Sequence, residues 1–235
     1  MKKTFAIIVL LVLIVASVFA ATGKPVTLIQ RFSYGLGAAL VENYGASAEQ
    51  ALEYFKAYQY NDILLDYGKQ GIEDYRNGNL KLSVQEINSA LNEYFTEFEK
   101  KNAELAKANL QQAELFLQEN GKSADVHTTV SGLQYRIIRQ GSGAVAKATD
   151  SVELDYELTS LSGKVLDSSY ARGKHSTFHM SGVIQGFREG VMLMPMGSCY
   201  IFYIHPSMGY GEQGTGNIEP NTLLIFKVET YNIAK

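Results

Sequence analysis

Three features of this sequence resemble chemical sites: a pair of histidines, one cysteine and a glycine-rich loop. His175 and His179 have the i, i+4 spacing of metal ligands, but no carboxylate or cysteine lies close to them in sequence. Cys199 begins an alternating, strand-like run, and no helix N-terminus or sharp turn follows it to activate the thiol. Residues 209–214 match GxGxxG, but the chain after them is too short for the βαβ unit that gives this motif its meaning. We therefore expect no metal, no cofactor and no nucleophile.

The remaining candidates are apolar and aromatic residues with a few polar groups among them. They are Tyr156, Phe178, Val183, Ile184, Phe187, Tyr210, Ile218 and Phe226, with Asp167 and Arg172 in the loop VLDSSYAR. Each of them taken alone is most simply explained as ordinary core. Together they describe a mostly apolar cleft with a few placed hydrogen-bonding groups, which is the usual form of a small-ligand site.

Short strands must position these residues. From Val126 onward the chain consists of strand-like runs separated by glycines and tight connections. This pattern predicts an antiparallel sheet over residues 126–235, with one short helix in the middle. The fold class of this half is therefore α+β.

The one helical segment in this half is unusual, because glycine recurs in it every four residues. Ile184, Phe187, Val191 and Met194 have the spacing of a buried helix face, whereas Gly182, Gly186 and Gly190 interrupt it. Each interior glycine costs a helix about 1 kcal/mol relative to alanine. We expect the sheet to hold this segment, with the glycines letting strand backbones approach. Val191 and Met194 would then anchor it, while Val183, Ile184 and Phe187 face the cleft.

The first half of the chain is helical, and it has no proline between Pro25 and Asn120. Ser83 and Glu86 form a capping-box pattern that predicts a helix start at Ser83. Upstream, FSYGLGAAL carries small residues that let helices approach closely, and residues 51–75 read as a second helical segment. We expect a helical dimerisation domain over residues 21–100 and a linker helix arm over residues 101–125. A monomeric helical cap on the second domain is the alternative.

Residues 1–20 have the pattern of a Sec signal peptide, namely two lysines, an apolar run and small residues at Val18 and Ala20. Cleavage after Ala20 would export the protein, most simply to the periplasm, with association to the outer membrane as the alternative. The formal net charge of −3 argues against nucleic acid as a partner. With Cys199 as the single cysteine, no intrachain disulfide can form.

From about Thr129 to its end, the chain resembles the FKBP-type peptidyl-prolyl isomerase domain. The motifs that carry this resemblance are SGLQY, VELDY, LDSSYARGK, TFHMSGVIQGFREGVMLMPMG, HPSMGYG and IEPNTLLIFKVE. The helical half and its arm are similar, more loosely, to the dimerisation domain and linker helix of the Mip and FkpA group. The resemblance implies a half-open antiparallel sheet wrapped around one short helix, with a pocket for a proline side chain between them.

The resemblance also implies roles for individual residues. Tyr156, Asp167, Phe187 and Tyr210 would be the catalytic residues, and Leu166, Arg172, Phe178, Val183, Ile184, Ile218 and Phe226 would bind the substrate. Phe187 would form the pocket floor, where the family usually has tryptophan. Tyr210 and the amide of Ile184 would donate hydrogen bonds to ligand carbonyls. Leu166 stands where the family usually has phenylalanine.

Two functions follow as hypotheses. The first is a dimeric isomerase that accelerates Xaa-Pro rotation in exported polypeptides without metal or cofactor, and macrolide inhibitors are candidate ligands by resemblance. The second is a holdase-type chaperone or peptide-binding module, in which a homodimer formed through residues 21–120 holds unfolded chains.

Overall fold

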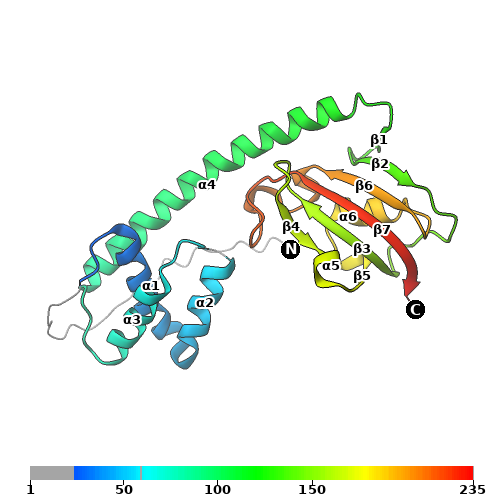
Figure 1. The fold of residues 1–235 in the computed structure, drawn as a ribbon. Coiled ribbons are helices and arrows are strands. Elements are labelled where there is room, and N and C mark those ends of the chain that lie inside the picture. Colours follow the sequence, from blue (N-terminus) through cyan, green and yellow to red (C-terminus); the bar gives the residue numbers. More distant parts are fainter. Residues whose placement is uncertain (1–23, 59, 235) are drawn as a thin grey trace. The chain divides into compact units, whose positions relative to one another are not determined.

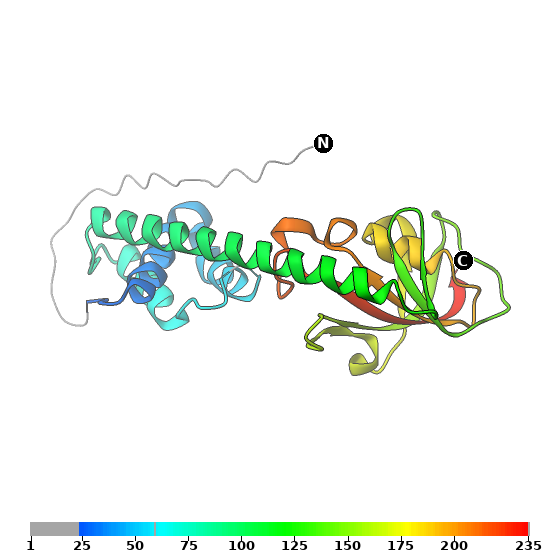
Figure 2. The ribbon, with the colours of Figure 1, turned by 90° about the horizontal axis from the view of Figure 1, so that it is seen from above.

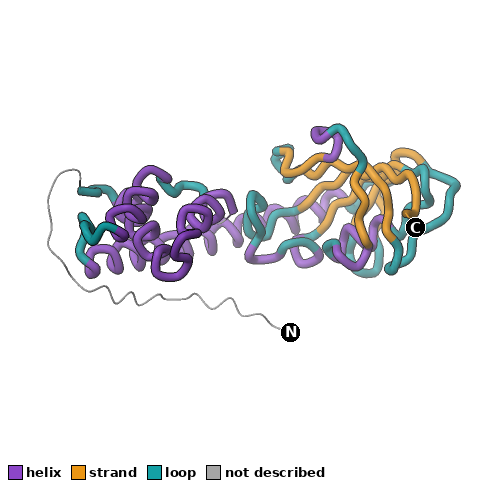
Figure 3. The backbone as a smooth tube through the Cα atoms, turned by 90° about the horizontal axis from the view of Figure 1, so that it is seen from below, coloured by secondary structure: helices purple, strands orange, loops and turns teal. Residues whose placement is uncertain are grey.

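The computed structural model describes residues 24–58 and 60–234. They form two compact units that divide after Lys101 (Figure 1). Helices make up the first unit, and strands dominate the second (Figure 3). The signal peptide assigned to residues 1–20 lies outside the described residues. No helix in the described part of the chain is long and apolar enough to cross a membrane.

The described part of the first unit contains four α-helical segments, and capping residues explain the starts of two of them. They are α1 (Leu28–Tyr44), α2 (Ala48–Tyr58), α3 (Leu65–Arg76) and the first part of α4 (Val84–Asn120). Thr27 and Gln30 form a capping box at the start of α1. At α4, Ser83 Oγ accepts from the Glu86 N–H at 3.2 Å, and the Glu86 carboxylate accepts from the Ser83 N–H at 2.8 Å. The helix start predicted at Ser83 is confirmed.

The prediction of a single helical segment over residues 51–75 is wrong. The chain forms two helices instead, because α2 ends at Tyr58 and α3 begins at Leu65. The connection is held inside the unit: Ile63 is fully buried, and the Leu64 N–H donates to Ser33 Oγ at 2.9 Å. These long-range contacts stabilise the break, and helical periodicity within the segment does not reveal them.

Helices α1 and α3 pack with their backbones in contact, as the small residues of α1 predict. A Cβ atom on Gly37 would lie 1.9 Å from the carbonyl oxygen of Gly68, and one on Gly71 would lie 2.0 Å from that of Tyr34. Glycine is therefore required at Gly37 and Gly71. Elsewhere in this unit, the ring of Phe32 stacks on that of Tyr94 at 3.6 Å between centroids.

The second unit contains one antiparallel sheet. Its strands are β1 (Val126–Thr128), β2 (Gln134–Arg139), β3 (Ser151–Thr159), β4 (Val165–Ser168), β5 (Ser176–His179), β6 (Cys199–Ile204) and β7 (Leu224–Ala234). The strand order is β1-β2-β6-β7-β3-β4, and β5 also pairs with β3. Every pairing between these strands is antiparallel. The α+β expectation is therefore confirmed.

The short helix α6 (Gln185–Val191) lies against one face of this sheet, over β6 and β7 (Figure 1). A Cβ on Gly186 would lie 2.4 Å from the side chain of Ile204, and one on Gly190 would lie 2.7 Å from the ring of Phe202. Two glycines thus admit strand side chains rather than strand backbones, which corrects our expectation. The third, Gly182, precedes α6 and has open space around it.

Helix α4 runs unbroken from Val84 to Asn120, across the boundary predicted at residue 101 (Figure 2). Its residues from Asn102 onward belong to the second unit. Asn109 Nδ2 donates to the carbonyl of Pro220 at 2.8 Å, and Asn221 Nδ2 donates to the carbonyl of Ala106 at 3.1 Å. Residues in the first part of the expected arm are therefore hydrogen-bonded to the loop that precedes β7.

Candidate active site

Four aromatic rings from four elements of the second unit meet beside the sheet. They are Tyr156 on β3, Phe178 on β5, Phe187 on α6 and Phe226 on β7. The centroid of the Phe187 ring lies 4.9 Å from that of Phe226, 5.9 Å from that of Phe178 and 6.3 Å from that of Tyr156. Phe187 therefore occupies the middle of the cluster.

The other apolar candidates pack against the same core. Ile218 is buried, and Leu166, Val183 and Ile184 are partly buried against the cluster that contains the four rings. Ile184 is the N-cap residue of α6, so its N–H lies among the helix-start donors that have no partner within a helix. The apolar residues singled out from the sequence thus all belong to one hydrophobic core.

A three-residue polar network borders the rings. The Tyr156 hydroxyl donates to Asp167 Oδ2, and Arg172 pairs with Asp167 Oδ1. Arg172 Nη2 also donates to the Tyr156 oxygen at 2.9 Å, and its guanidinium lies 5.5 Å from the centroid of the Tyr156 ring. The single hydroxyl proton of Tyr156 is therefore committed to Asp167, so this tyrosine fixes the network and is not a free donor.

The network shifts the pKa of both acidic groups in it. Burial, and then the hydrogen bond to Asp167, raise the pKa of the Tyr156 phenol. Burial opposes ionisation of Asp167, but the hydrogen bonds from Tyr156 and Arg172 outweigh it and hold the Asp167 pKa below its usual range. Near neutral pH the site thus holds a carboxylate, a neutral phenol and a guanidinium.

Tyr210 stands apart from this network. It precedes the 3-10 turn η4 (Gly211–Gln213), the residue is 38% exposed, and its hydroxyl has no hydrogen-bond partner among the described residues. Burial, and then the negative charge of Asp167, raise the pKa of Tyr210. Its hydroxyl keeps its proton near neutral pH and is available as a donor.

A second polar cluster lies on the other side of β3, and the sequence reasoning missed it. Asp155 Oδ1 accepts from Ser169 Oγ at 2.8 Å. Asp155 Oδ2 lies 2.8 Å from both His175 Nδ1 and the Tyr231 hydroxyl. Ser169 Oγ also accepts from the Tyr156 N–H at 2.9 Å. Asp155 therefore ties the segment after Asp167 to the strand that carries Tyr156.

One signal for this cluster is present in the sequence. Asp155 stands between Leu154 and Tyr156 in VELDY, so its side chain points to the opposite face of β3 from that of Tyr156. The same cluster explains His175, which contacts Asp155, whereas His179 contacts Ser181 Oγ at 2.7 Å. The described residues contain no group of three side chains that could hold a metal ion.

Comparison with known proteins matches the two halves of the chain to two family models. Residues 143–231 match the FKBP-type peptidyl-prolyl cis-trans isomerase model. Residues 29–137 match the domain that lies amino-terminal to FKBP-type isomerases.

Individual relatives agree with these models. The chain is 39% identical to the FKBP-type isomerase FkpA of Aeromonas hydrophila over 74% of its own length and 65% of that protein. It spans about three fifths or less of some other curated relatives. It is 32% identical to the outer membrane protein MIP of Legionella longbeachae, over 87% of this chain and 85% of that one.

A solved structure extends the similarity to the fold. The crystal structure of FkpA from Escherichia coli matches with a TM-score of 0.59 and 29% identity, covering 86% of this chain and 94% of that one. The ring cluster, its polar border and these matches agree with one another. The chain belongs to the FKBP-type peptidyl-prolyl cis-trans isomerase family.

Proposed function

We propose that this protein accelerates cis-trans rotation about Xaa-Pro bonds in exported polypeptides. The observation that carries the proposal is the packing of the Tyr156, Phe178 and Phe226 rings around Phe187, bordered by the Asp167 network. A proline side chain is compact and apolar, and it fits a site with aromatic walls. The polar groups of the Asp167 network lie on one side of the rings, where the client's peptide carbonyls next to proline can lie.

The reaction needs no bond to break. The barrier to rotation is about 18–20 kcal/mol, because resonance gives the C–N bond partial double-bond character. The planar amide separates more charge than the twisted one, so a pocket that excludes water from it favours the twisted form. Phe187 and the neighbouring rings exclude water, while the hydroxyl of Tyr210 and the N–H of Ile184 orient the carbonyls.

The Asp167 network has a positioning role in this proposal. Its three members satisfy one another through hydrogen bonds, so they hold the polar side of the pocket in place before a client binds. In this proposal, Leu166 and Ile218 lie at the rim of the pocket, where they contact the client residues next to its proline. Leucine at 166 offers less aromatic surface than the family's usual phenylalanine, so we expect a preference for clients with a large apolar residue before proline.

Relaxation of a Leu-Pro or Phe-Pro peptide from cis to trans tests this function with the full chain. We expect a rate that increases linearly with enzyme concentration and that Phe187→Leu reduces at least tenfold. Phe202→Leu is the matched control. Phe202 is a fully buried aromatic residue of the same core, and its ring on β6 packs against that of Phe187. An absence of acceleration by folded protein at micromolar concentration would refute the proposal.

The cellular setting is also part of the proposal. Residues 1–20 have the pattern of a Sec signal peptide, which supports export to the periplasm. Mass spectrometry of the protein recovered from a periplasmic extract tests this directly. A mature chain that begins at Ala21 supports it, and an intact Met1 in the cytoplasmic fraction contradicts it.

We further propose that residues 21–120 mediate a homodimer that also holds unfolded clients. The first unit has its own buried core, separate from the ring cluster, so a role of its own can be tested apart from the pocket. Sedimentation of the mature chain at micromolar concentration distinguishes a dimer from a monomer. Protection of a proline-poor client from aggregation that persists in Phe187→Leu would assign holding to the helices, whereas its loss would assign it to the pocket.

A further inference from the structure

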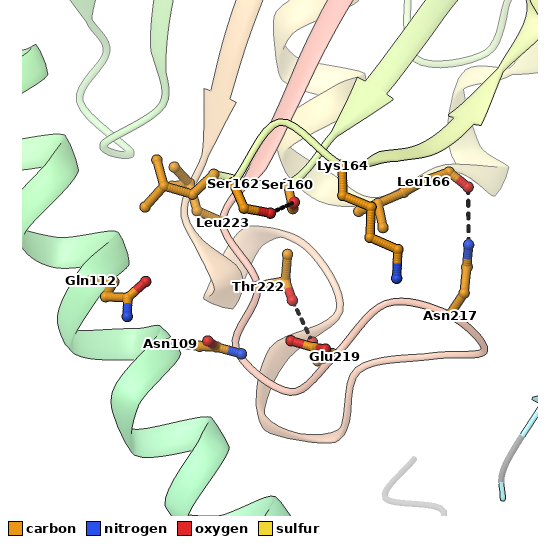
Figure 4. A pocket seen from close by; sticks show the side chains of 11 residues that line it. Asn109, Gln112, Ser160, Ser162, Lys164, Leu166, Asn217, Glu219, Thr222 and Leu223 are labelled. Carbon is orange, nitrogen blue, oxygen red and sulfur yellow. Dashed lines mark hydrogen bonds between the residues drawn. The ribbon is translucent and has the colours of Figure 1, made fainter. Parts of the chain in front are cut away.

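A small, partly open cavity with both polar and apolar walls lies beside the ring cluster and is lined by a different set of residues. Its walls come from α4, from the hairpin between β3 and β4, and from the loop that precedes β7 (Figure 4). All of these residues belong to the second unit. The cavity volume is about 180 Å³, below the roughly 300–1,000 Å³ of sites for free small ligands. It has room for one peptide group with a small side chain.

Hydrogen bonds hold the walls of this cavity in place. Asn109 of α4 donates to the carbonyl of Pro220 at 2.8 Å, which fixes the helix to the loop. Asn217 of the loop donates to the carbonyl of Leu166 at 3.0 Å, which fixes the loop to β4 (Figure 4). The cavity is therefore bounded on three sides by elements bonded to one another.

Two other polar side chains of the cavity wall have no hydrogen-bonding partner among the described residues. The Lys164 ammonium and the Gln112 amide point into it (Figure 4), and neither makes a hydrogen bond or ion pair with any part of the chain that the structure describes. The Glu219 side chain lies on the opposite wall from Lys164. The free groups thus include donors and an acceptor. A peptide or carboxamide group both donates and accepts, so it complements this lining better than a simple anion or cation does.

The cavity adjoins the ring cluster at one edge. Leu166 lines the cavity and also packs against the core that contains Tyr156 and Phe226. Asn217 lines the cavity directly before the buried Ile218. An extended chain advances about 3.3 Å per residue, so a polypeptide whose proline occupies the ring cluster reaches this edge within a few residues.

We propose that this cavity is a second subsite, which binds a main-chain peptide group or an amide side chain of the client close to its proline. Lys164 and Gln112 are its donors, and α4 is one of its walls. The inference rests on the proposed isomerase function. Because every residue carries a peptide group, such a subsite does not depend on the client's sequence. The proposal also makes the linker helix α4 part of the client-binding surface, in addition to a connection between the units.

Peptide length tests the subsite in the full chain. We compare a blocked four-residue Leu-Pro peptide with peptides extended by four alanine or serine residues on the N-terminal or the C-terminal side. Extension on one side is expected to raise kcat/KM by about three- to tenfold, the range of one or two net hydrogen bonds. Gln112→Ala and Lys164→Ala are expected to abolish that gain while short-peptide turnover stays within twofold.

Matched controls are available on the same surfaces. Gln111→Ala changes the neighbouring exposed residue of α4, and Lys147→Ala removes an exposed lysine elsewhere in the unit; neither residue lines the cavity. Both controls should keep the full gain from extension. The subsite proposal is overturned if extension gives no gain in the wild type, or if the gain persists in both cavity variants.

A binding measurement separates this proposal from the isomerase activity itself. Fluorescence anisotropy gives the dissociation constants of labelled short and extended peptides whether or not turnover occurs. Tighter binding of the extended peptide that is lost in Gln112→Ala supports the subsite even if no peptide is isomerised. Equal affinities for the two peptides would overturn it.

Discussion

Asp167 accepts a hydrogen bond from the hydroxyl of Tyr156 across the adjacent strands β3 and β4. Arg172 completes the triangle, since it donates to the Tyr156 oxygen and pairs with Asp167. All three residues come from one stretch of 17 residues between Tyr156 and Arg172. The polar side of the pocket is thus assembled by a local hairpin and the turn after it.

Removal of the Tyr156 hydroxyl tests this relationship. Tyr156→Phe keeps the ring but leaves Asp167 with only Arg172 and the Ser168 N–H as partners. A hydrogen bond to a charged group contributes about 1.5–3 kcal/mol, and partial exposure of Asp167 reduces this toward about 1 kcal/mol. We expect kcat/KM to fall about fivefold. Tyr200→Phe is the control, because it removes a hydroxyl bonded to Gln140 on the same sheet and should leave activity unchanged.

Alanine at Gly190 should destabilise the second unit. Its Cβ would lie 2.7 Å from the Phe202 ring, and such overpacking costs about 1–3 kcal/mol. The gain of about 1 kcal/mol in helix propensity offsets only part of this. Urea unfolding should therefore show a lower midpoint for Gly190→Ala. Gly182→Ala, which meets open space, should unfold like the wild type, and equal midpoints for the two variants would contradict the packing described for α6.

Asp155→Asn should weaken both stability and turnover. Hydrogen bonds from Ser169, Tyr231 and His175 outweigh the effect of burial and hold the Asp155 pKa below its usual range. The variant loses a charged acceptor, at a cost of about 1–3 kcal/mol near neutral pH. Looser attachment of the segment after Asp167 should also lower kcat/KM. Asp125→Asn, at an exposed carboxylate, should change neither quantity.

The direction of the pKa shift of Asp155 predicts how the stability loss in Asp155→Asn depends on pH. A carboxyl whose pKa is lowered on folding contributes stability that is fully present above its unfolded pKa, about 3.9 for aspartate. That contribution is lost as the pH falls through the lower, folded value. The difference in unfolding free energy between wild type and Asp155→Asn should be largest near pH 7 and shrink below about pH 4. A difference that grows in acid would refute our assignment.

Alanine at Gly37 should affect the first unit alone. Its Cβ would lie 1.9 Å from a backbone carbonyl of α3, so the two helices must separate, at a cost of about 3 kcal/mol or more. We expect an early unfolding transition for the helices by circular dichroism, with turnover of a short proline peptide unchanged. Ser47→Ala, an exposed change in the same unit, should show no early transition. Loss of peptide turnover in Gly37→Ala would show that the units do not fold separately.

Features encoded over a few residues could be predicted from the sequence. The capping box at Ser83 and Glu86, the alternating strands of the second half and the small residues of α1 that allow a close helix contact were all predicted. Each depends on hydrogen bonds or side-chain spacing within one turn or one strand. The ordered FKBP motifs added the candidate pocket residues, and four of their aromatic rings lie together beside the Asp167 network.

Other features depend on residues that meet only after the whole unit has packed. The break between α2 and α3 is held by Ser33, and the glycines of α6 accommodate Ile204 and Phe202. Asp155 meets Tyr231 from 76 positions away, and Asn109 meets Pro220 from 111 positions away. No local pattern records such partners, because their distance is set by the path of the chain between them. The sequence by itself was enough to predict the family, most of the elements and a set of candidate pocket residues, because these are encoded in local patterns and ordered motifs. The tertiary structure decided where α2 breaks from α3, how Asp155 meets its partners and how α4 walls a cavity, because these depend on distant residues.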